Sequence, residues 1–383
     1  MQSFAYLQMM DISCLLEAKS KGKDSRMQID GHHAMTYVAA RCAGYTHEDS
    51  EIIAYCAQYV DDATNDGCIE FDVGAMYSRT ASAHKMLDYR NLKELANHKV
   101  WVPFHFLPGN AGKPAGSDHG GDSFVRKLVC YPNSFVARDM LKACYESAGK
   151  PYFLHRIGIC MHVFADTWAH QGFAGVNHAI NEVEELESNE PEEDQSLFGK
   201  LANFFLSEAF PLGHGAALSH PDKPYLKWRY KNGLGEVIDR DNPAIFQEAV
   251  DYMCRALRAF KNNDRELDLV NVSGLNDMDL KEVRNLILSC RGDGDARHEQ
   301  WLEAIAEGRF SFGSADLGYI PKGVGSWKHA AIGQEKEKDE KDEIFEYQPE
   351  FLISNWKCFH DALQAVRFSI VKDVLPQYGI CAA

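Results

Sequence analysis

The sequence predicts a mainly α fold: a multi-helix, bundle-like domain with one buried metal-binding helix and long functional loops. Two observations lead to this prediction. Apolar residues recur at helical spacing through most of the 383-residue chain. One segment, residues 152–173, is apolar on almost every side yet contains histidine and aspartate. A helix that is apolar all round is normally buried, so we expect this segment at the centre of the fold.

The central segment, YFLHRIGICMHVFADTWAHQGF, has four potential metal ligands on one stripe. At about 100° per residue, His155, His162, Asp166 and His170 fall within roughly 80° of one another. A lone histidine on an apolar helix is more simply a core residue. An ionised aspartate and several imidazoles in a buried helix, however, are costly unless they are paired or bound to metal. We therefore predict that His162, Asp166 and His170 are metal ligands.

Upstream, a first helix offers two further histidines. Asp30 suits the N-cap position, and His32 and His33 would stand in the first turn that follows it. A helix start places ligands well, but Asp30 could equally do no more than cap. We include both histidines among the candidate metal ligands.

The next predicted helix ends at two adjacent aspartates, Asp61 and Asp62. Either is a candidate ligand or general base, depending on whether helical geometry persists to the last turn. A short strand is expected within residues 68–83. His105 follows in an aromatic segment that contains a proline, which favours an extended or looped backbone.

Downstream of the central segment, residues 211–230 are punctuated by glycine and proline and contain His214 and Asp222. Loops on a helical scaffold commonly hold functional residues, so both are candidate metal ligands. The last predicted helix packs on the body and contains the dipeptide His360-Asp361.

We expect one continuous domain in three parts. Residues 1–26 form an N-terminal extension, with Met27 as an alternative start. Residues 27–230 form the metal-binding helical core, and residues 231–383 form a C-terminal helical part packed on it. No internal repeat is visible.

Composition narrows the class of protein. With 45% hydrophobic and 25% charged residues, the chain is ordinary for a globular protein. It has no apolar run long enough to span a membrane, no secretory signal pattern, and eleven scattered cysteines that suggest reduced thiols. We therefore expect a cytoplasmic protein. The net charge of −16 disfavours long nucleic acid as a partner.

In chain order, the candidate ligands resemble those of the zinc-dependent phospholipase C and S1/P1 nuclease superfamily. The matching segments are DGHH, YVDDA, HFLPG, MHVFAD and HGAALSHPD, within roughly residues 27–225. The resemblance implies one zinc ion held by His105, His162, Asp166 and one of Asp61 or Asp62, a second bridged by Asp166 and held by His32 or His33, and a third held by His170, His214 and Asp222.

The chain departs from that superfamily in three places. The N-terminal tryptophan that binds metal is missing, His170 follows Asp166 at a shorter spacing, and the late His-x3-Glu is absent. Asp222, His220 or His178 would have to replace that last group. Superfamily members are also typically exported. We therefore expect two zinc ions in preference to three.

The function implied is hydrolysis of a phospholipid or another small phosphodiester by metal-activated water. Two alternatives stay open. His360-Asp361 favours an HD-type phosphohydrolase or a dinuclear iron enzyme, which iron or manganese in place of zinc would indicate. The acidic surface and the unmatched C-terminal part are compatible with a non-catalytic helical interaction protein holding a structural metal.

Overall fold

The computed structural model of the chain describes residues 29–83, 94–120, 123–190, 217, 219–337 and 343–382. The predicted extension, residues 1–26, lies outside these ranges. Among the described residues we find no helix with the length and apolar character that crossing a bilayer requires.

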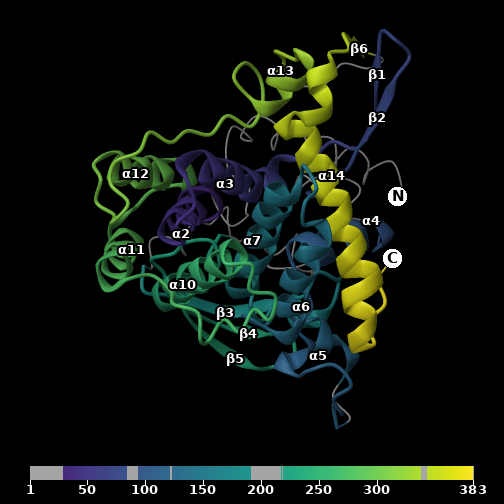
Figure 1. The fold of residues 1–383 in the computed structure, drawn as a ribbon. Helices are drawn as coiled ribbons and strands as arrows, with labels where there is room; N and C mark the ends of the chain where they lie inside the picture. Colours follow the sequence, from purple (N-terminus) through teal and green to yellow (C-terminus); the bar gives the residue numbers. More distant parts are fainter. Residues whose placement is uncertain are drawn as a thin grey trace, which may run out of the picture.

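Helix α7 (Phe153–Ala169) lies at the centre of the molecule (Figure 1). It packs against α3 (His47–Asp62), α14 (Asn355–Phe368) and α10 (Asn242–Lys261). Every α7 residue from position 155 to 169 is buried, which confirms the predicted burial of this segment. The helix ends at Ala169, so His170 is its C-cap residue.

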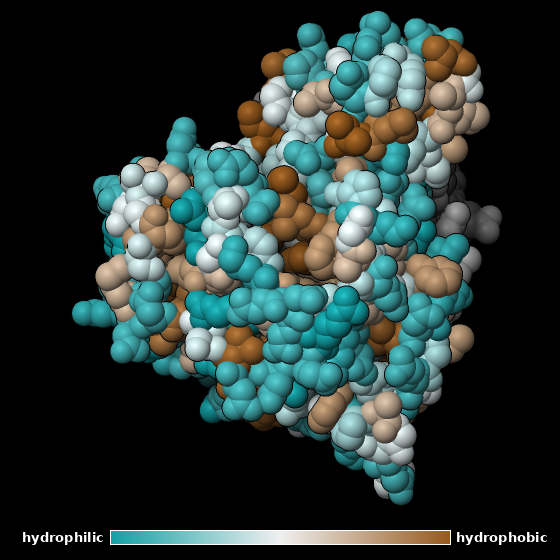
Figure 2. Space-filling view, in the orientation of Figure 1, coloured by the Kyte–Doolittle hydropathy of each residue, from teal (hydrophilic) through white to brown (hydrophobic). Residues whose placement is uncertain are grey.

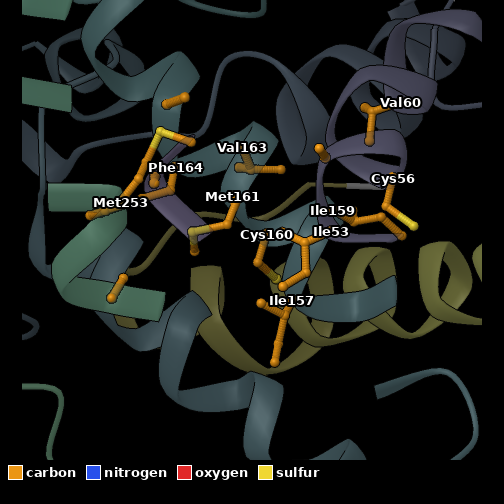
Figure 3. Close-up of a cluster of buried hydrophobic side chains, with 14 of the residues drawn as sticks. Ile53, Cys56, Val60, Ile157, Ile159, Cys160, Met161, Val163, Phe164 and Met253 are labelled. Atoms are coloured by element: carbon orange, nitrogen blue, oxygen red, sulfur yellow. The ribbon is translucent and has the colours of Figure 1, made fainter. Parts of the chain in front are cut away.

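The core around α7 is formed by side chains that are distant in the sequence. Figure 3 shows apolar residues of α3, α7 and α10 packed together, namely Ile53, Cys56, Val60, Ile157, Ile159, Cys160, Met161, Val163, Phe164 and Met253. The same cluster of buried residues extends to Trp301 and Leu363. The C-terminal part therefore shares one hydrophobic core with the rest of the chain.

The other helices surround this centre. They are η1 (Asp30–Met35, a π-helix), α2 (Thr36–Cys42), α4 (Glu94–Phe104), α5 (Phe124–Leu128), α6 (Phe135–Ala143), α11 (Asp277–Ser289), α12 (Gly294–Ala306) and α13 (Trp327–Ile332). Short 3-10 or π turns are η3 (Asn110–Gly112), η4 (Cys144–Ser147), η5 (Ala179–Asn181), η7 (Pro349–Ile353), η8 (Ser369–Val374) and η9 (Leu375–Tyr378).

Side-chain caps explain where several of these helices begin. Thr46 accepts a hydrogen bond from the backbone N–H of Asp49 (3.1 Å) and starts α3. Asp241 accepts from Ala244 N–H (3.3 Å) at the start of α10, where Pro243 occupies the first turn. Asp293 does the same for α12 through Ala296 N–H (3.1 Å). Each cap satisfies a backbone donor that the helix itself leaves without a partner.

The prediction of a mainly α fold is wrong, because the structure is mixed α/β, about 52% helical with 11% strand. The described residues form two three-stranded sheets, which lie at opposite ends of the molecule (Figure 1). One has the order β2–β1–β6 and the other β3–β4–β5. The strands are β1 (Gly67–Phe71), β2 (Met76–Arg79), β3 (Val183–Ser188), β4 (Lys227–Asn232), β5 (Val237–Asp241) and β6 (Ile344–Phe345).

The second sheet was not predicted because its strands are short and their sequence patterns are weak. In β4, Trp228 and Tyr230 point inward while their neighbours are exposed or partly exposed, and Asn232-Gly233 begins the turn to β5, a pattern typical of a hairpin. Strand β3 (VEELES) lacks apolar alternation, and its pairing with β4 is irregular between Glu184 and Glu187. Within the first sheet, the strand expected in residues 68–83 is present as the antiparallel pair β1–β2.

The backbone before His105 is also helical where an extended or looped form was expected. Pro103 lies inside α4, whose last residue is Phe104. Trp101 accepts hydrogen bonds from the backbone N–H groups of His105 (3.1 Å) and Phe106 (2.7 Å) through its carbonyl oxygen. The preference against helix before proline is thus outweighed by burial of this segment against α7 and α14.

The face shown in Figure 2 is mostly hydrophilic, and its apolar residues form small separate groups. Teal, the colour of hydrophilic residues, dominates this face.

Gly158 allows α7 and α3 to approach closely. A Cβ atom at this position would lie 2.5 Å from the carbonyl oxygen of Ile53 and 2.6 Å from Cys56 Cβ. Both contacts involve a packed helix rather than a flexible side chain. The glycine therefore sets the helix spacing on which the polar residues of α3 and α7 depend.

We predict that Gly158→Ala destabilises the protein. Alanine gains about 1 kcal/mol in helix propensity, but overpacking costs about 1–3 kcal/mol, and here the neighbouring atom is backbone. We expect a net loss of about 1–2 kcal/mol in the free energy of unfolding, measured by urea denaturation. Gly318→Ala is the control, because no atom lies within 4 Å of its Cβ position. Equal stability of the two variants would contradict the prediction.

Candidate metal centre

Five polar side chains from four elements meet beside the middle of α7. His32 comes from η1, Asp61 from the last turn of α3, and His105 from the residue after α4. His162 and Asp166 come from α7 itself. All five are buried, none more than 4% exposed. Such a concentration of polar groups in an apolar core requires a physical explanation.

Backbone carbonyls determine which ring nitrogen of two histidines faces the cluster. His105 donates its Nε2–H to the carbonyl oxygen of Ser82 (2.9 Å), and His162 donates its Nδ1–H to the carbonyl oxygen of Ala57 (2.7 Å). A neutral imidazole has one N–H, so the other nitrogen of each ring presents a lone pair. In both rings that nitrogen faces Asp166.

Three lone-pair atoms therefore converge. His105 Nδ1 and His162 Nε2 are 3.2 Å apart, and Asp166 Oδ2 lies 3.4 Å from the first and 3.2 Å from the second. With ligand bonds of about 2.0 Å, a tetrahedral zinc site has edges of about 3.3 Å. No proton is available to link these atoms once the tautomers are fixed. A cation between them would turn mutual repulsion into coordination.

His32 and Asp61 extend the cluster on the other side of Asp166. His32 Nε2 lies 3.3 Å from Asp166 Oδ1 and 4.0 Å from Asp61 Oδ2, and Asp61 Oδ1 lies 3.9 Å from His105 Nδ1. Asp166 Oδ1 thus faces His32, whereas Asp166 Oδ2 faces His105 and His162. Two overlapping groups, His32/Asp61/His162 and His105/His162/Asp166, have ligand atoms within 4.8 Å of one another.

The protonation states fit metal binding. Burial lowers the pKa of His32 to about 4 and also lowers the pKa values of His105 and His162. Burial by itself raises the pKa of Asp166, but the surrounding imidazoles outweigh it and hold that pKa well below its ordinary value. The cluster therefore combines neutral histidines with an ionised carboxylate, the forms in which these residues bind metals.

Unsatisfied polar atoms provide independent support. Neither ring nitrogen of His32 and neither carboxylate oxygen of Asp166 makes a hydrogen bond with adequate geometry among the described residues. Buried polar atoms normally have partners. The residues present therefore fit a bound metal ion.

His170 borders the cluster at the end of α7. Its Nδ1 donates to the carbonyl oxygen of His105 (2.7 Å) and lies 3.6 Å from Asp166 Oδ2, while its ring stacks on Phe106. Arg240 of β5 donates to the carbonyl oxygens of Ala169 (2.8 Å) and Gln171 (2.7 Å). It thereby satisfies backbone carbonyls at the C-terminal end of α7. Sheet β3–β4–β5 thus contributes to the placement of His170.

Two candidates adjacent to cluster residues point into other networks. Asp62 accepts hydrogen bonds from Tyr319 O–H (2.7 Å) and Gln58 Nε2–H (3.3 Å). His33 Nδ1 contacts His298 Nε2 (2.9 Å). The structure therefore separates Asp61 from Asp62 and His32 from His33, which the sequence could not do.

Among the described residues, the groups of potential metal ligands do not include the later candidates Asp222, His178 and His220. Asp222 is fully buried, burial raises its pKa well above the ordinary value, and the charges of Asp166 and Arg297 act on it. His214 lies outside the described residues. His178 accepts the N–H of Ile180 (3.0 Å) as the cap of η5, and His220 contacts the carbonyl oxygen of Ala217 (3.1 Å).

His360 and Asp361 do not form a ligand pair. His360 Nδ1 faces the backbone N–H of Thr80 (3.5 Å), whereas Asp361 pairs with Lys357 and accepts from Tyr77 O–H (2.9 Å). Neither belongs to a group of potential metal ligands among the described residues.

Sequence reasoning missed the residues that support the ligands. Arg297 binds Asp30 and Arg240 caps α7, yet each lies far along the chain from its partner. For Arg297, the signal available in the sequence was an arginine within the apolar helical pattern RHEQWLEAIA of α12.

His155, the fourth residue of the predicted stripe, lies outside the cluster. Its Nε2 donates to Asn355 Oδ1 (3.0 Å), and its ring contacts Trp327. Burial lowers its pKa to about 4 from the ordinary 6.5. It is a neutral core histidine.

We predict that His155 contributes to acid destabilisation. Between pH 6.5 and 4 the unfolded chain binds a proton on this histidine while the folded protein resists it, so stability falls as pH falls. The loss approaches about 3 kcal/mol at the acid end. His155→Gln keeps a donor for Asn355 and should make stability less dependent on pH in this window, as measured by urea denaturation at several pH values. An unchanged slope would count against this assignment.

Comparison with known proteins gives one match. The model of a family described as a family of unknown function (DUF6765) matches residues 27–374. We found no match to the chain among curated proteins or among solved structures.

Proposed function

The chain belongs to the DUF6765 family of unknown function, and we propose from its own site that it is a metal-dependent hydrolase of small phosphoesters. The observation on which this proposal depends is the convergence of His105 Nδ1, His162 Nε2 and Asp166 Oδ2 at mutual distances of 3.2–3.4 Å. Their proton-bearing nitrogens are directed to backbone carbonyls.

The number of potential metal-ligand atoms favours two zinc ions. His105, His162 and one oxygen of Asp166 supply one position, and His32, Asp61 and the other oxygen of Asp166 supply a second. A closed structural zinc site uses four ligands, commonly with cysteine, whereas the nearest donors here are all His and Asp. Two divalent ions in such a site would polarise a phosphoryl oxygen and lower the pKa of a water molecule.

The chain's own residues have distinct roles in this proposal. Asp166 would bridge the two positions, and the imidazoles would hold them while Ser82 and Ala57 carbonyls keep the rings oriented. Asp61 lies 3.9–4.0 Å from the facing atoms of His105 and His32, so it is the residue we assign as general base or as a further ligand.

A small substrate fits the charge of the protein better than a long polyanion does. The net charge of −16 opposes binding of extended nucleic acid, and the proposal is limited to a phospholipid head group or another small phosphodiester. His360 and Asp361 contact different partners and do not point to a common site, so no observation on the described residues supports the HD-type alternative.

The test begins with the protein purified without added metal. Elemental analysis should find about two zinc ions per chain, and Asp166→Asn should lose most of them. Hydrolysis of a chromogenic phosphodiester and of phosphatidylcholine should fall with the metal. Wild-type protein without bound metal would contradict the proposal, and so would metal-replete protein that hydrolyses neither substrate.

The adjacent aspartates provide a matched pair of variants. Asp61→Asn should lower the rate by about 10²–10⁴, as for loss of a general base, with the fold retained. Asp62→Asn changes the same atoms one residue away, in the network of Tyr319 and Gln58, and should leave the rate within a few-fold of wild type. Equal losses in both variants would contradict the role of Asp61.

A further inference from the structure

His32 differs from the other histidines of the metal centre in how it is held. His105, His162 and His170 each donate a hydrogen bond from one ring N–H to a backbone carbonyl oxygen. Neither nitrogen of His32 makes a hydrogen bond among the described residues. Its ring stacks on that of His162, with centroids 3.7 Å apart, and its Nε2 faces Asp166 Oδ1 at 3.3 Å. A partner on the ring nitrogen that points away from the metal normally orients a metal-binding imidazole. His32 Nδ1 has no such hydrogen bond among the described residues, so we look to the backbone of η1 for what orients this ring.

Helix α12 contacts η1 on both sides of His32. Arg297 donates from Nε to Asp30 Oδ2 (2.7 Å) and from Nη2 to Asp30 Oδ1 (3.1 Å). The next residue, His298, contacts His33 Nδ1 through its Nε2 (2.9 Å). Thus two consecutive residues of α12 bind positions 30 and 33, which flank His32 in a single π-helical turn. Isolated π turns recur at functional sites.

The Asp30–Arg297 pair is suited to fixing geometry. Both side chains are buried, and the pair is bidentate, the arrangement that adds most directional specificity to an ion pair. Arg297 also donates to the carbonyl oxygens of Gly292 (2.8 Å) and Asp222 (3.3 Å). One guanidinium group therefore joins η1, the start of α12 and the segment at Asp222.

We propose that Arg297 is a positioning residue, which acts through Asp30 to direct His32 Nε2 toward Asp166, with His298 assisting through His33. The inference rests on the proposed metal site. It assigns to the C-terminal part a role in metal binding: ions held through His32 depend on the docking of α12, whereas the donors His105 and His162 do not.

The experiment is a double-mutant cycle read by Co²⁺ binding, with the visible absorbance of the bound ion as the signal. Asp30→Asn/Arg297→Gln is used as one unit because it replaces the ion pair by neutral hydrogen-bonding groups and strands no charge. The Co²⁺ affinity of this variant is compared with that of wild type. The same comparison is then made between His32→Ala and the protein that combines His32→Ala with the two substitutions. We expect about a 10–100-fold loss of apparent Co²⁺ affinity in the presence of His32, the range for loss of an outer partner, and little change in its absence.

Arg156→Gln is the matched control. Arg156 is equally buried and donates to Ser147 Oγ (2.6 Å) and Ser369 Oγ (2.7 Å), at a distance from η1. The Arg156→Gln variant should bind Co²⁺ with the affinity of wild type. If the neutral pair fails to fold, as judged by circular dichroism, Arg297→Lys replaces it in the same cycle because it keeps the charge and loses the bidentate geometry.

Each outcome decides the inference. Equal losses of affinity with and without His32 would mean general loosening of the site and would overturn it, as would no loss in either background. A wild-type protein that binds no Co²⁺ would instead refute the proposed metal site, and the positioning role with it. Only a loss of Co²⁺ affinity that requires His32 supports the assignment of Arg297 as a positioning residue.

Discussion

The structure depends on the burial of one carboxylate, that of Asp166, among imidazoles that are themselves neutral. Burial lowers the pKa values of the histidines, while the pKa of Asp166 stays well below its ordinary value. An ionised group in an apolar core is costly unless an opposite charge accompanies it. Because the imidazoles are not cationic at neutral pH, we propose that a metal ion supplies the opposite charge beside Asp166 and that the surrounding helices hold its ligands.

Helix α7 contributes to this cluster through its close packing on α3. Gly158 brings the helices together, so that the carbonyl oxygen of Ala57 reaches His162 Nδ1 (2.7 Å) and Asp61 faces the same cluster. Sheet β3–β4–β5 contributes at the C-terminal end of α7, where Arg240 of β5 donates to the carbonyl oxygen of Ala169. Helix α12 secures η1 through Arg297. Elements that are distant in the sequence, namely η1, α3, α7 and the end of α4, therefore meet at one small polar cluster.

The sequence predicted the part of this arrangement that is local. His162 and Asp166 lie one helical turn apart, so the 3.6-residue period was enough to place them together and to predict the burial of α7. It could not choose between Asp61 and Asp62, because that choice depends on Tyr319, 257 positions away. Nor could it place His155, which Asn355 binds. The second sheet and strand β6 were missed, because β3 lacks an alternating pattern and β6 has two residues that pair with a distant strand.

The most direct test of a metal centre at Asp166 is anomalous X-ray diffraction from crystals of the protein, recorded on both sides of the zinc absorption edge. The account predicts an anomalous peak at about 2 Å from His105 Nδ1, His162 Nε2 and Asp166 Oδ2, with a second toward His32 and Asp61. Crystals grown with zinc that show no peak at this position, or peaks only at surface residues, would contradict it.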